Sequence, residues 1–203
     1  MEVTLERFDK ARHDGGAVAA LLYQTDPQLM SMVFGSQSEA VPSLRKLLAR
    51  EHNQYAGRHV TCALHEGHVV GVLAGYDGRA KRAMEAGSAR DWPGSLGLWR
   101  LLKTMPRALA IARTTTKALG DDDYYISALC VGPRCRGCGV GSRLLEHALR
   151  DRGTVRTDVS IHNPRALAFY RRHGFAIEAE NTVRWRGRTI GHHAIARAPS
   201  AAA

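Results

Sequence analysis

The chain has 203 residues, of which 44% are hydrophobic and 24% are charged, values close to those of ordinary globular proteins. This composition excludes disordered and fibrous proteins, and the length favours a single domain over residues 1–203. No apolar run approaches the roughly 18 residues of a membrane-spanning helix. The N-terminus also lacks the apolar stretch of a secretion signal. We therefore expect a cytoplasmic protein without a membrane partner.

The formal net charge of +10 fits three kinds of partner: nucleic acid, an anionic membrane surface or a polyanionic small ligand. The basic residues are scattered, without a run of five or more and without the interleaved aromatic residues of a base-stacking surface. Nucleic acid is therefore a disfavoured partner, and charge alone does not choose among the others.

The four cysteines are too few and too bunched for a secreted disulfide framework. Cys135 and Cys138 have the spacing of half a zinc site, but no second pair of ligands follows at a suitable distance. The sequence therefore predicts no metal, and it leaves open whether these two thiols have a redox role.

The first half of the chain reads as strand, helix, helix and hairpin. Residues 2–8 alternate in polarity, and Asp14 precedes a helix-like run. A second helix is predicted over about 43–51, followed by two strands over 59–66 and 68–76. Glu66-Gly67 between these strands predicts a hairpin turn whose glycine takes a positive φ.

Residues 77–120 are predicted to form a helical insertion, rich in Gly, Arg and Lys over 77–94 and helical over 95–119. Pro106 should kink or split this helix. One stripe of its apolar side chains either packs in the core or covers a substrate site or a dimer contact. A homodimer is therefore possible. The stripe comprises Leu98, Trp99, Leu102, Met105 and Leu109. The last residues, about 198–203, read as a flexible tail.

A strand, a glycine-rich loop and a helix follow, over about 124–131, 132–142 and 140–153. Gly137, Gly139 and Gly141 let several backbone N–H groups converge at the start of the helix, which suits a pyrophosphate. Arg134 and Arg136 add full positive charges beside this point.

A dinucleotide-binding fold is an alternative, because Gly137-x-Gly139-x-x-Ser142 resembles its fingerprint and Asp158 follows about 20 residues later. That fold expects the acidic residue at the end of a strand, whereas residues 159–161 continue the strand here. After this strand, Asn163-Pro164 starts a helix that Gly174 ends, and strands over about 175–185 and 189–197 complete the chain.

Two segments resemble signatures of the GNAT superfamily of N-acetyltransferases. Arg134-Cys-Arg-Gly137-Cys-Gly139 fits the family's coenzyme A loop, Arg/Gln-x-x-Gly-x-Gly/Ala. The segment from Asn163 through Tyr170-Arg-Arg-His-Gly174-Phe175 is similar to the second signature. The resemblance is specific over residues 124–180, and the first 76 residues match only in the order of their elements.

This resemblance implies an α/β fold with a strongly bent, mixed central sheet, helices on both faces, and two strands that part in a V. Acetyl-CoA would lie in the V as acyl donor for an amine-bearing acceptor, with no metal. The residues implied to bind the cofactor are Leu129, Cys130, Val131, Arg134, Arg136, Gly137, Cys138, Gly139, Val140, Gly141, Ser142, Asn163 and Tyr170. Cys135 and Cys138 depart from the aromatic or basic residues common at these loop positions.

The resemblance also implies the catalytic roles. Tyr170 would protonate the departing thiolate, although a core tyrosine is the competing interpretation. Asp158 is the leading general base, against a structural aspartate paired with Arg156. His162, Glu178 and Tyr125 are reserves for the base, and a water relay is a further alternative.

The predicted function is acetyl transfer to a primary amine of unidentified acceptor. A non-catalytic acyl-CoA binding module and a nucleic-acid binder remain alternatives. At pH 7, deprotonating a lysine-like amine costs about 4.6 kcal/mol, whereas an α-amine costs about 1 kcal/mol. An α-amine acceptor would therefore demand less from a weak base.

Overall fold

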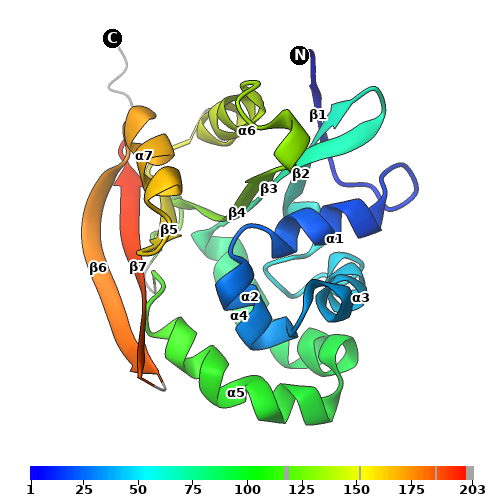
Figure 1. The fold of residues 1–203 in the computed structure, drawn as a ribbon, viewed down its shortest axis with the longest axis vertical. Coiled ribbons are helices and arrows are strands. Elements are labelled where there is room, and N and C mark those ends of the chain that lie inside the picture. The colour runs from blue at the N-terminus through cyan, green and yellow to red at the C-terminus, as the bar shows by residue number, and fades with distance from the viewer. Residues whose placement is uncertain (117–118, 151, 186, 200–203) are drawn as a thin grey trace.

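The computed structural model describes residues 1–116, 119–150, 152–185 and 187–199. Seven strands form one sheet in the order β1-β2-β3-β4-β5-β7-β6 (Figure 1). The pairing of β4 with β5 is parallel, whereas the other five pairings in the described chain are antiparallel. The predicted mixed sheet is therefore confirmed. A doubly wound parallel sheet is excluded, so the dinucleotide-binding alternative is wrong.

The strands lie where the alternation of polarity places them. Both turn residues of the β2–β3 hairpin have positive φ, 50° at Glu66 and 76° at Gly67, as a two-residue turn between twisted strands requires. The seven strands are β1 Thr4–Arg7, β2 Val60–His65, β3 His68–Asp77, β4 Tyr124–Val131, β5 Val155–Ser160, β6 Ala176–Trp185 and β7 Arg188–Arg197.

Helices cover both faces of the sheet (Figure 1). One buried cluster joins the first three helices to the sheet, and a second joins α6 and α7 to the opposite face. The helices are α1 Gly15–Tyr23, α2 Pro27–Phe34, α3 Gln37–Leu48, α4 Gly78–Leu96, α5 Leu98–Ala112, α6 Val140–Leu149 and α7 Pro164–Arg172, with short 3-10 turns η1 Gly57–His59 and η2 Pro133–Cys135.

The helices before β2 differ from the prediction. The helix expected over 43–51 begins at Gln37, because the Glu39 carboxylate accepts a hydrogen bond from the Ser36 amide at 2.8 Å and closes the first turn. Helix α2 was missed altogether. Asp26 caps it by accepting from the Leu29 amide at 3.0 Å, and Pro27 supplies a pre-set φ at its first position.

The helical segment after β3 also differs. The chain breaks at Gly97, where φ is 81°, and α5 runs on through Pro106, so of the kink or split expected at the proline the split is wrong. Three residues of the apolar stripe face solvent, with Trp99, Leu102 and Leu109 exposed by 71%, 56% and 59%, so core packing is the wrong one of the two interpretations of this stripe. The side chain of Leu98 and residues 200–203 of the expected tail lie outside the described residues.

A β-bulge in β4 changes which face of the sheet the side chains of this strand point to. Ala74 pairs with Ala128 and Gly75 with Ile126, so Ser127 is an extra residue on β4. Ile126 belongs to the buried cluster under α6, whereas Ala128 belongs to the cluster under α1–α3. Strict alternation would have placed these two side chains on the same face.

Beyond the bulge, β4 and β5 part. Their register ends with Ile126 opposite Thr157, although β4 continues to Val131 and β5 to Ser160. The predicted V between these two strands is confirmed.

Burial of one histidine makes the fold sensitive to acid. His59 packs against the Tyr76 ring at 5.8 Å between centroids, and burial, with Arg58 and Arg7 nearby, lowers its pKa from 6.5 to about 4. Between these two pH values the unfolded chain binds a proton that the folded chain does not, so the free energy of unfolding decreases as the pH falls.

We expect His59→Gln to remove part of this decrease between pH 7 and pH 5 in urea titrations. His68→Gln, on the exposed start of β3, is the control, and equal slopes in both variants would contradict the assignment.

Candidate active site

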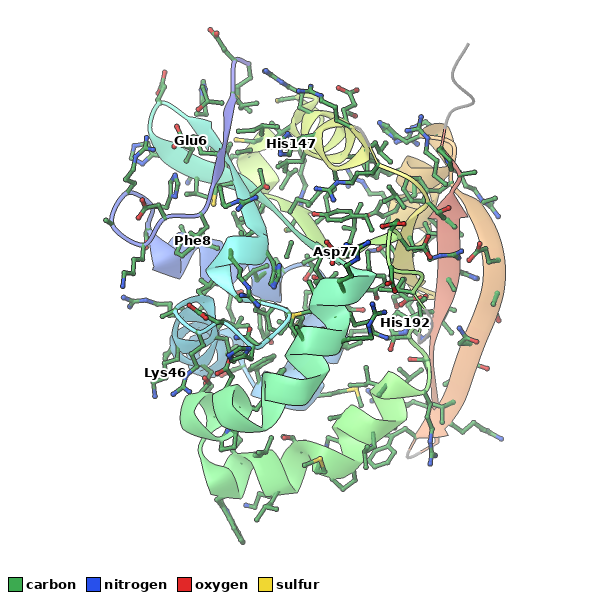
Figure 2. All side chains as sticks on the ribbon, turned by 180° about the vertical axis from the view of Figure 1, so that it is seen from behind. Glu6, Phe8, Lys46, Asp77, His147 and His192 are labelled. Atoms are coloured by element: carbon green, nitrogen blue, oxygen red, sulfur yellow. The ribbon has the colours of Figure 1, made fainter. Side chains whose placement is uncertain are left out.

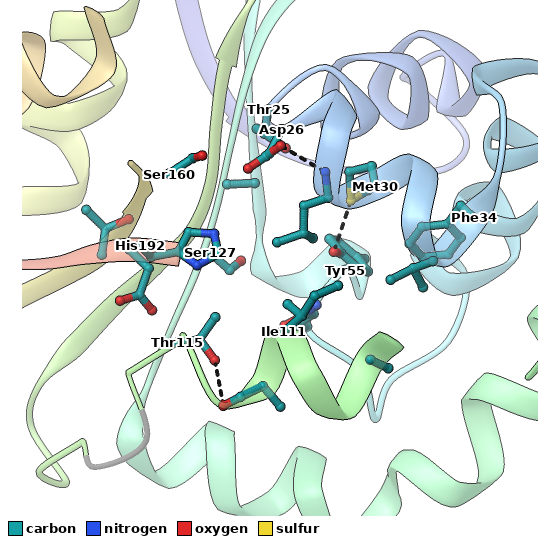
Figure 3. Close-up of a pocket in the computed structure, with 18 of the residues that line it drawn as sticks. Thr25, Asp26, Met30, Phe34, Tyr55, Ile111, Thr115, Ser127, Ser160 and His192 are labelled. Atoms are coloured by element: carbon teal, nitrogen blue, oxygen red, sulfur yellow. Dashed lines mark hydrogen bonds between the residues drawn. The ribbon is translucent and has the colours of Figure 1, made fainter. Parts of the chain in front are cut away.

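A cavity of about 670 Å³ lies at the V. Ser127 and Leu129 of β4 line one side of the opening, and Asp158 and Ser160 of β5 line the other. Side chains of α2 and α5 complete the wall away from the sheet, as Figure 3 shows for Met30 and Ile111. The parted strands therefore open directly into a chamber large enough for a small molecule.

Helix α5 covers this cavity. Its lining residues Leu101, Thr104, Ala108 and Ile111 recur at three- and four-residue spacing, on a face turned away from Trp99. Of the two roles considered for the segment over 95–119, core packing by the predicted stripe is wrong. The helix covers the candidate site mainly with the neighbouring face, and Met105 is the one stripe residue in the described lining.

Tyr170 of α7 reaches the cavity from the side of β5. The residue is 6% exposed, and its ring packs edge-on against Phe169 and Phe175 at 5.3 and 5.2 Å between centroids. Burial raises the pKa of this phenol, and a hydrogen bond with the Thr157 side chain acts against the shift. The phenol is therefore protonated at neutral pH, as a proton donor must be.

Asp158 of β5 also lines the cavity, within a hydrogen-bond network. Its carboxylate accepts from the Tyr125 hydroxyl at 2.6 Å and from the Thr116 amide and hydroxyl at 2.7 and 2.8 Å. Burial and the Asp158 charge together raise the pKa of Tyr125 well above its ordinary value, so Tyr125 donates this bond at neutral pH. Three of the roughly four acceptor positions of the carboxylate are thus occupied, and one remains.

Arg156 takes no part in this network. Its guanidinium pairs with Asp123 at 3.1 Å and also with Glu178. The interpretation of Asp158 as a strand aspartate paired with Arg156 is therefore wrong.

His192 of β7 is a cavity residue that the sequence analysis missed. The Thr114 hydroxyl is 2.8 Å from the Ile111 carbonyl and 2.9 Å from Nδ1 of His192. If the hydroxyl donates its single hydrogen to Ile111, its oxygen accepts from Nδ1, and the lone pair of the imidazole is then on Nε2. No local pattern marked the residue, because its hydrogen-bond partner Thr114 lies 78 positions earlier and its strand partner Ser160 lies on β5.

The state of charge of His192 follows from its neighbours. Burial lowers its pKa, and His193 acts in the same direction, whereas Asp158 and Asp26 act against the shift. The imidazole is therefore neutral at pH 7 and able to accept a proton. Figure 3 shows its ring on the same side of the pocket as Ser127 and Ser160.

Two of the reserve bases lie elsewhere. Nε2 of His162 is within 3.1 Å of the Thr189 carbonyl, beside a neighbouring hollow, and Glu178 of β6 pairs with Arg156 of β5. Neither residue is among those that line the cavity in the described chain.

The glycine loop lies at the start of α6. Gly137 and Gly139 have φ of 81° and 79°, and a Cβ atom at either position would meet nothing within 4 Å. No side chain caps α6, so its first amides are available to a ligand. Open space, uncapped amides and two nearby arginines suit an anion such as a pyrophosphate.

The predicted cofactor residues are used in different ways. Arg136 donates from Nε to the Val131 carbonyl at 3.0 Å, which leaves its terminal nitrogens for a ligand. Ser142 contacts Nε2 of His173 at 3.1 Å, and Asn163 caps α7 by accepting from the Ala166 amide at 3.0 Å. Leu129, Asn163 and Tyr170 line the cavity; Arg134, Arg136, Gly137, Cys138 and Gly139 are exposed on the loop; Cys130 and Val140 are buried; and Val131, Gly141 and Ser142 are half-buried.

The four cysteines are free, and the described residues contain no group of His, Cys, Asp or Glu side chains that could hold a metal ion. None of the described helices is long and apolar enough to cross a bilayer.

The sequence model of the Acetyltransferase (GNAT) family matches residues 24–175. The chain belongs to this family. The match includes the glycine loop, the V and α7, which are the elements that build the site described above.

Solved structures share the GNAT fold along almost the whole chain. An acetyltransferase of Corynebacterium glutamicum described as related to histone acetyltransferase HPA2 has a TM-score of 0.63 at 21% identity, covering 100% of this chain and 99% of that one. An N-acetyltransferase of Staphylococcus aureus Mu50 has a TM-score of 0.63 at 18% identity, with 95% and 99% covered. The NatC complex, solved with a Gag peptide and CoA, has a TM-score of 0.57 at 13% identity, with 98% and 100% covered.

Curated relatives match over a shorter part. The chain is 39% identical over 59 residues to the peptidyl-lysine N-acetyltransferase YjaB of Escherichia coli (strain K12). This match spans 29% of the chain and 40% of the relative. The Salmonella typhimurium protein of the same name is 36% identical over 59 residues, which is 41% of its length.

The glycine loop of this GNAT protein can be tested with a matched pair of substitutions. We expect Gly139→Glu to abolish acetyl-CoA binding in calorimetry, because it places bulk and negative charge beside the uncapped amides of α6. Gly67→Glu is the control, since Gly67 also has a positive φ with nothing within 4 Å of a Cβ, but lies in the β2–β3 hairpin. Unchanged binding in Gly139→Glu, with the control also unchanged, would remove the loop from the cofactor site.

Proposed function

We propose that this GNAT protein is an acetyl-CoA dependent N-acetyltransferase in which a primary amine attacks the thioester directly. The observation that carries the proposal is the V between β4 and β5. It joins the uncapped start of α6 at one end to a cavity with a buried, protonated Tyr170 at the other.

The donor would bind along the V. The edge of β4 beyond Ile126 has no partner in β5, so the backbone of Leu129–Val131 is available to the amide groups of the pantetheine arm. Arg134, Arg136 and the amides of residues 137–142 would hold the pyrophosphate. In this role acetyl-CoA supplies an acetyl carbon that is already activated as a thioester.

The acceptor must reach the acetyl carbon as a neutral amine. Its nitrogen forms a bond to the acetyl carbon, the bond from carbon to sulfur breaks, and one proton leaves the nitrogen. Asp158 and His192 both line the cavity where this proton must go. Because three donors already occupy Asp158, the free Nε2 of His192 is the more available acceptor, and the Asp158 charge would favour the imidazolium that forms.

Tyr170 would supply the proton that the departing thiolate requires. A phenol is a weaker acid than a thiol, so the transfer is favourable only when it is coupled to cleavage of the carbon–sulfur bond. Its fixed position against Phe169 and Phe175 supports such a role, because coupled transfer requires a donor that is already in place.

We expect Tyr170→Phe to lower kcat by about 10²-fold or more, because the general acid is lost while the ring that packs in the core is kept. The Kd for acetyl-CoA should change little. Steady-state kinetics and calorimetry on the same preparation measure the two quantities. Parallel losses of binding and turnover would instead mean that Tyr170 is a binding or core residue.

His192 predicts a specific pH dependence. Because its pKa is lowered, the wild-type kcat/KM, calculated per neutral amine in solution, should be sustained to below pH 6.5 and then fall as the imidazole becomes protonated. We expect His192→Gln to lower kcat/KM by about tenfold or more and to remove this acidic limb. Asp158→Asn is the comparison. If it removes the limb and His192→Gln retains it, Asp158 is the base.

The experiment that tests the proposed function is calorimetric titration with acetyl-CoA, with NAD as a parallel ligand, followed by a thiol-release assay with a panel of amines. Saturable acetyl-CoA binding together with amine-dependent thiol release supports the proposal. Binding without release for any amine would favour a non-catalytic acyl-CoA module.

A further inference from the structure

The cavity has two chemically different ends. Figure 3 shows Ser127, Ser160 and His192 on the side of the V, and Met30, Tyr55 and Phe34 on the far side. Trp92 of α4 joins the far side, which we name the aromatic arm: Met30, Phe34, Tyr55 and Trp92. The polar end suits the reaction, whereas the aromatic arm lies beyond the groups that the reaction uses.

The aromatic arm is a packed apolar wall. The Phe34 ring stacks on Trp92 at 5.9 Å between centroids and contacts Tyr55 edge-on at 6.1 Å, and Tyr55 contacts Trp92 at 6.4 Å. The Tyr55 hydroxyl donates to the thioether sulfur of Met30 at 3.5 Å, and burial raises its pKa to about 12. Met30, Phe34 and Tyr55 are only 2%, 1% and 7% exposed, so a ligand at this end of the cavity meets chiefly the half-buried Trp92 ring, which the other three residues hold in place.

The charge of the cavity is opposite to that of the protein. The chain carries a net charge of +10, yet the described lining contains Asp26 and Asp158 and neither Lys nor Arg. A carboxylate or phosphate on the acceptor would find no cation in this lining. An ammonium ion would instead be attracted to the two carboxylates before it loses its proton.

Resting on the proposed function, we propose that the acceptor is a small primary amine that carries an aromatic or branched aliphatic group, with this group bound in the aromatic arm. The nitrogen then lies toward Asp158 and His192, and the apolar group is removed from water against Phe34 and Trp92. A protein lysine would bring a polar backbone toward the same cavity and leave the aromatic arm unfilled. The small hydrophobic amine uses both ends.

The test compares 4-phenylbutylamine, butylamine and Nα-acetyl-lysine amide as acceptors with acetyl-CoA. All three are primary alkylamines with a pKa near 10.4, so deprotonation costs about the same for each. Filling an apolar pocket changes specificity by about 10-fold to 200-fold for even one methylene. We expect kcat/KM for 4-phenylbutylamine to exceed that for each of the other two by at least about 100-fold.

Two substitutions on α5 locate the effect. Ala108 lines the cavity, so Ala108→Phe should occupy space that the phenyl group needs and lower the 4-phenylbutylamine to butylamine ratio by about tenfold or more. Leu109→Phe is the matched control, because Leu109 is 59% exposed and does not line the described cavity. Ala108→Leu serves as a smaller filling variant if Ala108→Phe fails to fold, as judged from its melting temperature.

Calorimetry of 4-phenylbutylamine without acetyl-CoA separates this inference from the proposed function. Binding that Ala108→Phe weakens and Leu109→Phe retains supports the aromatic arm even if no acetyl transfer occurs, and that result would overturn only the proposed function. Equal or better use of Nα-acetyl-lysine amide, or a ratio that Ala108→Phe and Ala108→Leu leave unchanged, would overturn the inference while leaving acetyl transfer in place.

Discussion

The parting of β4 from β5 is the constraint on which the rest of the site depends. A central strand in a sheet normally satisfies its backbone on both edges, because an unpaired buried amide or carbonyl costs free energy comparable to a lost hydrogen bond. Beyond Ile126, β4 keeps its pairing with β3 and has no partner in β5. The exposed edge is stable only beside water or a ligand that carries its own amide groups. The fold therefore creates a linear binding edge without adding a loop, and it holds that edge rigid through β3.

The bulge at Ser127 determines which side chains of β4 point into the opening between β4 and β5. The extra residue adds local twist and exchanges the faces of β4, so Ala128 points toward the cluster under α1–α3 whereas Ile126 points toward α6. The strand stays in register with β3 on either side of the bulge. Ser127, Ala128 and Leu129, at and after the bulge, therefore line the cavity together with Tyr125, whereas Ile126 packs toward α6.

Prediction from the sequence succeeded where the signal is local. Positive φ at Gly67, Gly137 and Gly139 could be inferred from turn and loop chemistry, and the two signatures identified the fold and the position of Tyr170. It was incomplete where long-range packing decides. The stripe through Trp99 and Leu109 matches a helical period, but the periodicity left open whether this face packs in the core or covers a site, and the cavity is lined mainly by the neighbouring face through Leu101 and Ala108. His192 escaped detection because its role depends on a hydrogen bond to Thr114, 78 positions earlier.

The segment after α5 links these features to the chemistry. Thr114 contacts Nδ1 of His192, and Thr116 donates to both oxygens of Asp158, while the preceding helix lines the cavity with Ala108 and Ile111. In the proposed function, one stretch of chain would therefore control two properties that acetyl transfer to an amine requires together: an unprotonated nitrogen acceptor and a space that selects what reaches it. A change in the position of α5 would alter both at once. Specificity and proton transfer would thus be coupled through α5 and the segment that follows it, on the side of the V that is proposed to receive the acceptor.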